Sequence, residues 1–333
     1  MKKYQTVPGN NRIDKTECDV PEVGPLDVKV RVKAASLNYR DILTRQYTKK
    51  VVVPFSDGAG EIAEVGNQVT EFKVGDRAAG LFFPTWLDGQ IDHNINAVSR
   101  GAGKTDGMLS DYVVGHQDSF ISIPEHLNYE EASTLPCAGL TAWHALFEHE
   151  KPVQKGQTVL IQGTGGVSVF AVQIAAAYGL KSIVISSSDE KLERVKQMGA
   201  THTINYKDTP DWDDAVLELT EGKGVDIVLE VGGADTLEKS LKAVKINGVI
   251  SLIGVLTGID GKINPFPILT KSLRVFGIYV GSKAMQTRFH HALSEHAIHP
   301  VIDRVFNFDE ANAAYDYQLA GKHFGKIVIQ VNA

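Results

Sequence analysis

From residue 156 onward, short apolar runs alternate with segments of helical spacing, and this alternation constrains the fold more than any other feature. The apolar runs predict strands at 158–162, 182–186, 202–205, 225–230, 249–253, 274–280 and 326–331. The segments of helical spacing predict helices at 167–178, 189–197, 212–221 and 236–243. Short buried strands with helices between them are typical of a doubly wound parallel sheet. We therefore predict an α/β fold with a Rossmann sheet.

A glycine-rich loop, Gly163-Thr164-Gly165-Gly166-Val167, directly follows the first of these strands. Gly163 permits a tight turn, and Gly165 lets the main chain approach a diphosphate closely. The helix that starts at Val167 would offer the anion its N–H groups and the positive end of its dipole. Ser168 replaces the third glycine of the usual fingerprint and is still small. We predict that this loop binds a nicotinamide dinucleotide; the alternative is a glycine-rich turn without a ligand.

The second strand ends in Ser186-Ser187-Ser188, and Lys191 follows shortly after. A carboxylate at this distance from the glycine loop would bind the ribose 2′-hydroxyl of NAD and repel a 2′-phosphate. Hydroxyl groups and a nearby cation favour the phosphate instead, so we predict NADP (NADPH), with Ser186, Ser187 and Lys191 as contacts. NAD stays open as an alternative, because Ser188 or Asp189 is also a good N-cap and Asp189 brings negative charge close.

The first 125 or so residues predict strands and turns. Val28, Val30 and Val32 alternate with charged residues, which is the pattern of a half-buried strand, and 59–65 and 110–114 are similar. Glycines and prolines between these runs indicate an irregular barrel with many turns. Residues 130–145 have helical spacing. We interpret the polar, glycine-rich stretch 84–107 as a long surface loop.

Length and composition limit the remaining possibilities. A chain of 333 residues is long enough for two domains. The net charge of -6 argues against nucleic acid as a partner, since phosphate binding needs clustered lysines and arginines. Two cysteines cannot form a disulfide framework, and we find no apolar leader and no run of about 18 apolar residues. We expect a cytoplasmic enzyme without a membrane partner.

Several segments, in a fixed order, carry a family resemblance: 34–41 (AASLNYRD), 57–61 (DGAGE), 74–77 (VGDR), 135–142 (LPCAGLTA), the glycine loop and 323–326 (HFGK). Over essentially its whole length the chain resembles the medium-chain dehydrogenase/reductase superfamily. In that family a GroES-like β-barrel catalytic domain precedes a Rossmann dinucleotide-binding domain, and the end of the chain returns to the catalytic domain. The resemblance implies a catalytic domain at 1–125 and 270–333 and a Rossmann domain at 126–269.

Zinc-dependent members of this family bind catalytic zinc through a cysteine, a histidine and a further cysteine or histidine. Here Asn38 occupies the first position and Ser56 the second, and only Cys137 remains at the third. One soft ligand cannot hold a catalytic Zn²⁺, which requires three protein ligands and an open position. The four closely spaced cysteines of the family's structural zinc lobe are also missing. We therefore predict no metal site, and we interpret Cys137 as a packing residue.

These departures match the zinc-independent branch, which is similar to quinone oxidoreductases and enone reductases. The resemblance implies hydride transfer from NADPH to a quinone or an α,β-unsaturated carbonyl, with a hydrogen-bond donor stabilising the developing oxyanion. Asn38 and Tyr39 replace the metal-centre segment and are the candidate donors, Asn38 as an orienting amide. Thr141 resembles the family threonine near the nicotinamide. Arg40 is expected to pair with Asp41 or Asp57.

Further cofactor contacts are expected at the strand ends, where doubly wound sheets bind ligands. They are Val231, Gly232, Ile253 and Gly254, together with Tyr206, Phe276 and Ile278, which match family positions. Lys326 could reach the cofactor or be an ordinary surface or strand-edge lysine. The strand at 274–280 matches the region that joins two Rossmann sheets in family dimers, so the resemblance implies a homodimer.

Other readings remain open. The chain could be an NAD(P)-dependent alcohol dehydrogenase, since relatives with this glycine loop are often grouped with those enzymes, or a non-catalytic NADPH-binding sensor or structural protein. The substrate is a small molecule that the sequence does not identify. Four histidines gather on or after a late helix: His290, His291, His296 and His299. They lack companion carboxylates or cysteines, so we expect packing or solvated positions for them.

Overall fold

The computed structural model describes residues 1–102 and 104–331. Contacts divide the chain into two compact units, residues 1–140 with 280–333 and residues 141–279. The boundaries expected from the sequence, after 125 and before 270, lie earlier in the chain. The difference at the first boundary arises because helix α3 (Tyr129–Ala132) packs on strands β3 (Asp27–Leu37) and β4 (Asp57–Val65) of the first unit. Within the described ranges, no helix combines the length and apolar character needed to cross a membrane.

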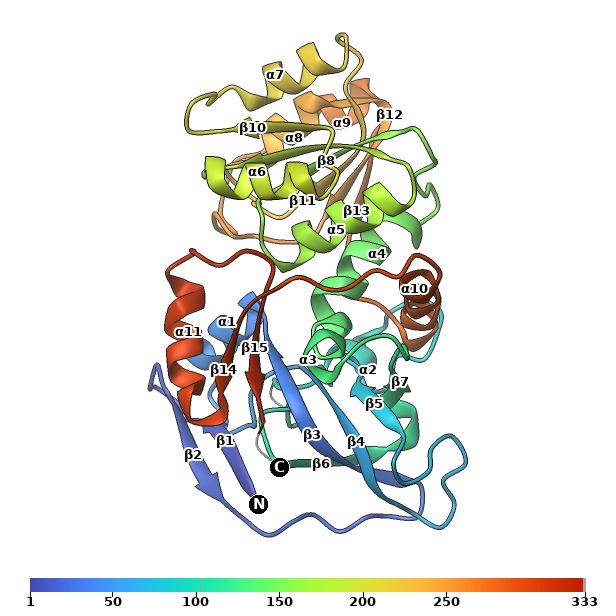
Figure 1. The fold of residues 1–333 in the computed structure, drawn as a ribbon. Coiled ribbons are helices and arrows are strands. Elements are labelled where there is room, and N and C mark those ends of the chain that lie inside the picture. Colours follow the sequence, from blue (N-terminus) through green and yellow to red (C-terminus); the bar gives the residue numbers. More distant parts are fainter. Residues whose placement is uncertain (103, 332–333) are drawn as a thin grey trace. The chain divides into compact units, whose positions relative to one another are not determined.

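The second unit contains a six-stranded parallel sheet in the order β10-β9-β8-β11-β12-β13 (Figure 1). Its strands are β8 (Thr158–Gln162), β9 (Lys181–Ser186), β10 (His202–Asn205), β11 (Val225–Glu230), β12 (Val244–Leu252) and β13 (Arg274–Gly277). The apolar runs of the sequence form these strands, and the predicted Rossmann fold is confirmed. The sheet order reverses at β8, so the loop after β8 lies at the point where such folds bind ligands.

Helices flank this sheet. They are α4 (Leu140–Phe147), α5 (Gly166–Ala177), α6 (Asp189–Gln197), α7 (Trp212–Leu219), α8 (Leu237–Ala243) and α9 (Phe266–Thr270). The side chains of α7 and α8 form a buried cluster with β8, β9 and β11, whereas α5 and α6 contact β8, β9 and β10 from the other face (Figure 1). The predicted helix over 130–145 is wrong as a continuous helix. Pro136 lacks an N–H, and a π-helical turn, Leu135–Gly139, separates α3 from α4.

The first unit contains a seven-stranded sheet in the order β14-β15-β3-β4-β5-β7, with β6 also paired to β3. The strands not yet bounded are β5 (Arg77–Gly80), β6 (Tyr112–His116), β7 (Phe120–Ser122), β14 (Ile302–Asn307) and β15 (Lys326–Gln330). The expected GroES-like unit is confirmed. Strand β15 pairs antiparallel with β3 in a register that sets Ile327 opposite Leu37. The end of the chain therefore places Lys326 beside residue 38.

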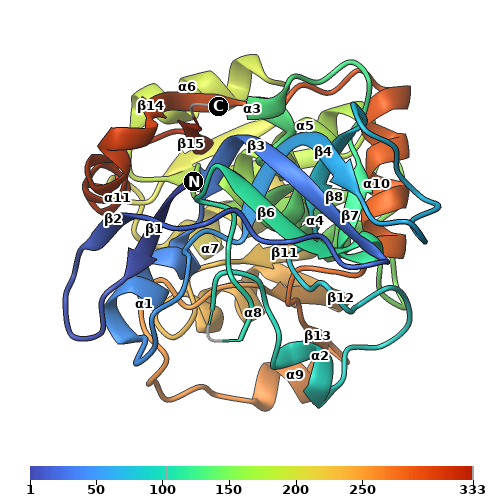
Figure 2. The same ribbon diagram turned by 90° about the horizontal axis from the view of Figure 1, so that it is seen from below.

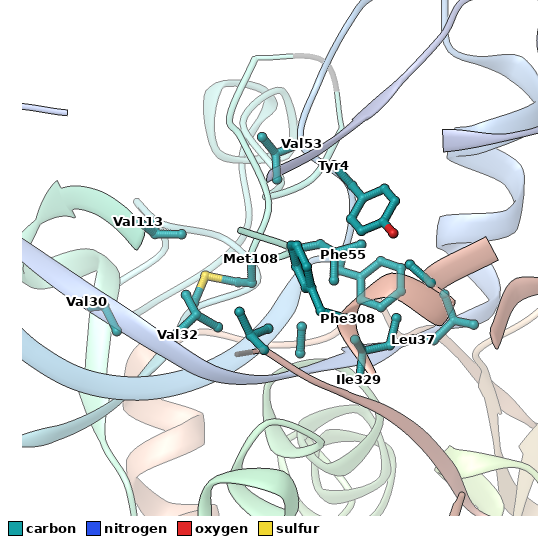
Figure 3. Close-up of a cluster of buried hydrophobic side chains, with 14 of the residues drawn as sticks. Tyr4, Val30, Val32, Leu37, Val53, Phe55, Met108, Val113, Phe308 and Ile329 are labelled. Atoms are coloured by element: carbon teal, nitrogen blue, oxygen red, sulfur yellow. The ribbon is translucent and has the colours of Figure 1, made fainter. Parts of the chain in front are cut away.

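A two-stranded ribbon, β1 (Lys2–Thr6) and β2 (Ile13–Glu17), lies beside helix α11 (Ala311–Leu319) (Figure 2). Asn312 on that helix exchanges two hydrogen bonds with the main chain of Ile13. Beneath the ribbon, a buried cluster that includes Tyr4, Val32, Met108 and Phe308 fills the interior of the unit (Figure 3). The remaining helices of this unit are α1 (Tyr39–Tyr47), α2 (His93–Asn96) and α10 (Lys283–Glu295).

The stretch 84–107 is not a surface loop throughout, which corrects the sequence interpretation. Trp86 and Arg100 are both buried, at 3% exposure. The Trp86 ring packs edge-on against Phe83, and the Arg100 guanidinium lies over the Phe120 ring and donates to the main-chain oxygen of Leu81. The polar composition of this stretch predicted exposure, but main-chain oxygens and an aromatic face can accommodate a buried arginine.

Candidate functional site

The glycine loop has the geometry that its sequence requires. Gly163 has a φ of 72°, in the left-handed region that favours glycine, and its N–H donates to Ile185 O at 2.7 Å. Gly165 is the N-cap of α5, and no side chain caps this helix. A Cβ added to Gly165 would meet no atom within 4 Å. The start of α5 thus offers main-chain N–H groups beside open space, which suits a diphosphate.

The serine in the third glycine position has a defined contact. Ser168 is buried, and its hydroxyl donates to the main-chain oxygen of Gln162 at 2.6 Å. This bond attaches the first turn of α5 to the end of β8. Thr164 is buried, while Gly166 and Val167 are half-buried at the start of the helix. The loop and the helix therefore form one closely packed junction.

The predicted 2′-phosphate contacts lie around the end of β9. Ser186 is buried, whereas Ser187 and Lys191 are half-exposed. Ser188 is the N-cap of α6 and accepts from the main-chain N–H of Lys191, so the capping alternative holds for Ser188 and leaves Ser187 available. Tyr206 is 41% exposed, and its N–H donates to Ser186 O at 3.1 Å. These residues come together at the carboxyl ends of β9 and β10.

The carboxylate of Asp189 lies near the proposed 2′-phosphate contacts, but it has partners of its own. Its carboxylate accepts a hydrogen bond from the side-chain amide of Asn205 at 2.8 Å. It also begins α6, where negative charge interacts favourably with the helix dipole. Both interactions give the carboxylate partners other than a ribose.

The loops after β11 and β12 hold the other predicted contacts. Gly233 has a φ of 95°, and a Cβ on Gly232 would lie 2.1 Å from the Thr236 hydroxyl oxygen, so both positions require glycine. The N–H groups of Ile253 and Gly254 both point to Glu230 O, at 2.8 and 3.2 Å. Val231, Gly232, Ile253 and Gly254 therefore belong to adjoining loops at the carboxyl edge of the sheet.

Two predicted contacts beyond β12 are less open. The Phe276 ring stacks on the imidazole of His149, with centroids 4.9 Å apart, and Ile278 is buried. Thr141, the first residue of the second unit, is 4% exposed. None of these three has a hydrogen bond that identifies a ligand-binding role.

In the first unit, Lys326 is buried rather than on the surface, so the interpretation as an ordinary surface lysine is wrong. Its ammonium donates to Asn38 Oδ1 at 2.5 Å and to Leu37 O at 2.7 Å. A lysine ammonium has only donors, so the oxygen of the Asn38 amide must face it. The amide NH₂ of Asn38 is consequently directed away from Lys326, and it lies 3.5 Å from the Ser56 hydroxyl.

A buried carboxylate completes this cluster. Asp57 accepts from the Ser56 hydroxyl at 2.7 Å and from the main-chain N–H of Cys137 at 3.1 Å. Burial raises the pKa of Asp57 and lowers the pKa of Lys326, while the opposite charge of each partner moves both pKa values back. Burial, assisted by the charge of Asp57, raises the pKa of the Cys137 thiol. This thiol is therefore not activated as a nucleophile.

The remaining candidates of the first unit have diverse surroundings. Tyr39, the first residue of α1, is 44% exposed. The Arg40 guanidinium lies 3.7 Å from Asp41 Oδ1 and donates to Arg100 O at 2.6 Å, as the expected structural pairing requires. The buried His290 contacts Ser122 O at 3.1 Å. Within residues 1–102 and 104–331, no three His, Cys, Asp or Glu side chains could together hold a metal ion.

Four residues of the site have roles that the sequence did not assign to them. Asp57 and Lys326 come from strands far apart in the chain, and two strand pairings bring them near Asn38: β3 with β4, which sets Asp57 opposite Ser36, and β3 with β15, which sets Ile327 opposite Leu37. Gln162 and Glu230 end neighbouring strands, and their side chains hydrogen-bond at 2.6 Å. For Gln162 and Glu230 the sequence did contain a signal, because each is a polar residue at the end of an apolar strand.

Comparison with known proteins places these units among characterised families. Residues 24–125 match the model of the alcohol dehydrogenase GroES-like domain, and residues 166–297 match that of the zinc-binding dehydrogenase. A zinc-type alcohol dehydrogenase-like protein of Schizosaccharomyces pombe is 41% identical, over 99% of this chain and 98% of its own. A quinone oxidoreductase-like protein 2 homolog of Nematostella vectensis is 30% identical, over 92% of this chain and 82% of its own. The crystal structure of a candidate alcohol dehydrogenase from Sinorhizobium meliloti 1021 is 41% identical, with a TM-score of 0.93, covering 99% of this chain and 98% of that one.

Proposed function

The chain belongs to the medium-chain dehydrogenase/reductase superfamily of NAD(P)-dependent oxidoreductases, and within it we propose a zinc-independent, NADPH-dependent reductase of quinones or α,β-unsaturated carbonyls. One observation carries the proposal: the buried ammonium of Lys326 lies against Asn38, at the position where zinc-dependent members have their first metal ligand.

The donor set around Asn38 does not fit zinc. Cys137 is the one soft ligand of the three positions, and a catalytic zinc ion requires three protein ligands. The oxygen of Asn38 already accepts from an ammonium, and a second cation beside Lys326 would be repelled. The names of relatives that include zinc describe those proteins, and this chain differs at the ligand positions.

The glycine loop fits a dinucleotide, because Gly165 opens onto free space and α5 begins there without a side-chain cap. Ser187 and Lys191 are half-exposed at the end of β9, where we place the 2′-phosphate. A bound NADPH supplies the hydride. The protein's part is to bind the diphosphate at the loop and to orient a hydrogen-bond donor toward the oxygen of the substrate.

We propose Asn38 as that donor. Lys326 and the hydrogen bonds of the NH₂ to Ser56 and Asp57 fix the orientation of the amide. On substrate binding, one of its two N–H groups would turn to the carbonyl or quinone oxygen and stabilise the negative charge that develops there. Asp57 balances the charge of Lys326, which keeps the buried lysine compatible with a stable fold. Tyr39, exposed next to Asn38, is a second candidate donor, and Thr141 is proposed to contact the nicotinamide.

The test is a substrate screen that follows NADPH absorbance with quinones, enones and simple aldehydes, together with oxidation of primary and secondary alcohols. We expect turnover of quinones or enones by protein that contains no stoichiometric zinc and is unaffected by chelators. Alcohol oxidation that depends on bound zinc would establish the alcohol dehydrogenase alternative. NADPH binding without turnover of any electrophile would favour a sensor or structural protein.

We also propose that the protein is a homodimer joined at β13. This strand is one edge of the six-stranded sheet, and exposed sheet edges are normally covered or protected. Val275 on it is 39% exposed, and Phe266 and Leu269 on the adjacent α9 segment are 63% and 76% exposed. The opposite edge, β10, has the polar sequence HTIN instead. A second copy that pairs with β13 would cover these apolar side chains.

A further inference from the structure

A fully buried carboxylate lies at the end of β11, in the loop region proposed to hold the dinucleotide. Oε1 of Glu230 accepts from the N–H groups of Gly232 and Gly233, each at 2.9 Å, and from the Thr236 hydroxyl at 2.6 Å. These bonds wrap the 231–236 loop around the carboxylate. The loop conformation therefore depends on an acceptor with several lone pairs at this position.

The second oxygen joins this loop to the glycine loop. Glu230 Oε2 accepts from Gln162 Nε2 at 2.6 Å and from the Ser240 hydroxyl. Gln162 Oε1 accepts in turn from the N–H groups of Val231 and Gly232, both at 3.1 Å. Both ends of the Gln162 amide are engaged, so its orientation is determined by its partners. Gln162 directly precedes Gly163.

The same pair reaches two further segments. The main-chain oxygen of Gln162 accepts from Ser168 at the start of α5, and the main-chain oxygen of Glu230 accepts from Ile253 and Gly254 after β12. The glycine loop, the loop after β11 and the loop after β12 are all proposed to contact the cofactor. All three are thereby hydrogen-bonded to the side chains or main-chain oxygens of Gln162 and Glu230.

The chemistry of this network is costly for stability alone. The five side-chain hydrogen bonds to Glu230 come from neutral groups: two main-chain N–H groups, two hydroxyls and one amide. A buried carboxylate with neutral donors loses its hydration and gains no opposite charge, whereas an apolar residue of similar size would avoid that loss. Such a group is well suited to define positions, because each of its bonds has a required direction.

We propose that Gln162 and Glu230 are a positioning pair, which holds the glycine loop and the 231–233 loop at the spacing that a bound dinucleotide needs. The inference rests on the proposed function, since it concerns the same cofactor. It assigns the pair no contact with the reacting atoms. Its effect is expected on the affinity for the whole dinucleotide rather than on the chemistry of hydride transfer.

An exchange of the two side chains tests the pair. In Glu230→Gln, the new NH₂ faces Nε2 of Gln162, which lies 2.6 Å from the replaced oxygen, so two donors oppose each other. In the double variant Gln162→Glu/Glu230→Gln, an amide again faces a carboxylate and every donor has an acceptor. We expect the single variant to raise the Kd for NADPH about tenfold or more, and the double variant to return it to within about threefold of the wild type.

Fluorescence of bound NADPH gives these Kd values, and adenosine 2′-monophosphate, which has no 5′-phosphate to reach the glycine loop, provides a probe that engages only the end of β9. Its affinity should be unchanged in Glu230→Gln, because Ser187 and Lys191 are not part of the network. A loss of affinity for both probes in equal measure would indicate general damage to the unit and would overturn the positioning role.

Asp226 provides a matched control on the same strand. It is near the opposite end of β11, where it accepts from Thr158 N at 2.8 Å and pairs with Lys245, so it also joins β8 to β12. Asp226→Asn should lower the melting temperature and leave the Kd for NADPH unchanged. Should Glu230→Gln fail to fold, Ser240→Ala removes one hydroxyl, which donates to Glu230 and accepts from Gln162 Nε2 at 2.8 Å, and it is expected to raise that Kd about threefold.

Two results would contradict the inference: wild-type affinity for NADPH in Glu230→Gln, or a double variant that folds but binds as weakly as the single one. Failure of the wild-type protein to bind NADPH or NADH would contradict the proposed function instead, so the two failures are distinguishable.

Discussion

The ammonium of Lys326 lies 2.5 Å from the side-chain oxygen of Asn38, although the two residues are 288 positions apart in the chain. The contact depends on the pairing of β15 with β3, and it determines which end of the Asn38 amide faces away from the lysine. A fold that brings the end of the chain back to the first unit thereby sets the orientation of the proposed oxyanion donor.

Asn38→Asp tests this donor directly. The aspartate has the same shape and can still accept from Lys326, but it has no NH₂. We expect kcat for quinone or enone reduction to fall about 100-fold, as when one oxyanion donor is removed, while the Kd for NADPH changes less than twofold. Steady-state kinetics and nucleotide titration measure the two quantities.

Lys326→Met should produce a related defect through orientation. The Asn38 amide would be free to rotate, and Asp57 would lose the charge that balances it, so we expect lower kcat together with a lower melting temperature. Unchanged kcat in both variants would rule out Asn38 as the donor.

Cofactor choice is tested at the end of β9. Ser187→Asp places a carboxylate where a 2′-phosphate is proposed to lie, so the preference should change from NADPH to NADH. Lys191→Met should weaken NADPH binding about tenfold and leave NADH binding unchanged, because only NADPH carries the phosphate. Lys196→Met, near the other end of α6, is the matched control and should change neither affinity. Equal affinities for the two cofactors in the wild type would refute the preference.

The oligomeric proposal predicts a monomer when charge is added to the β13 edge. Leu269 is 76% exposed in the single chain, and Leu269→Glu would place a carboxylate in the proposed interface. Light scattering should show a dimer for the wild type and a monomer for this variant. Leu219→Glu, on α7 beside the opposite edge of the sheet, should remain dimeric. A monomeric wild type would be evidence against the interface.

The sequence was sufficient for the second unit because its signals are local. Apolar runs and helical spacing predict the strands and helices, and Gly163 carries the positive φ that its turn requires. Long-range relationships were not accessible in this way. Lys326 is buried because β15 pairs with β3 in a register that sets Ile327 opposite Leu37. No local pattern around Lys326 distinguishes it from an exposed lysine. The predicted helix over 130–145 missed the π-helical turn at Leu135–Gly139, although Pro136 was a visible signal.

Buried polar residues were also misjudged, for one physical reason. Arg100 and Glu230 have side chains that are usually exposed, yet both are buried because main-chain groups satisfy much of their hydrogen bonding. Partners of this kind depend on loop conformation, which the sequence pattern does not give. The candidate site was therefore predicted at its glycine loop and missed at the side chains that support it.

His290 gives a prediction for the pH dependence of stability. Burial lowers its pKa to about 4, below the ordinary value of 6.5 that it has in the unfolded chain. Between these values the unfolded state binds the proton and the native state does not, so stability is lost as the pH falls from about 6.5 to about 4. The full effect is roughly 3 kcal/mol, at about 1.4 kcal/mol for each pKa unit.

Asp41 acts in the opposite direction in nearly the same range. Burial raises its pKa from 3.8 to about 6, so the native state takes up the proton first and gains stability as the pH falls from about 6 to about 4. The pH profile of the wild type is therefore flatter than either group alone would make it. His290→Gln should reverse the slope toward greater stability at acid pH, and Asp41→Asn should steepen the acid loss. Urea unfolding of the three proteins between pH 4 and pH 7 measures this, and parallel profiles would show that neither group titrates as its burial implies.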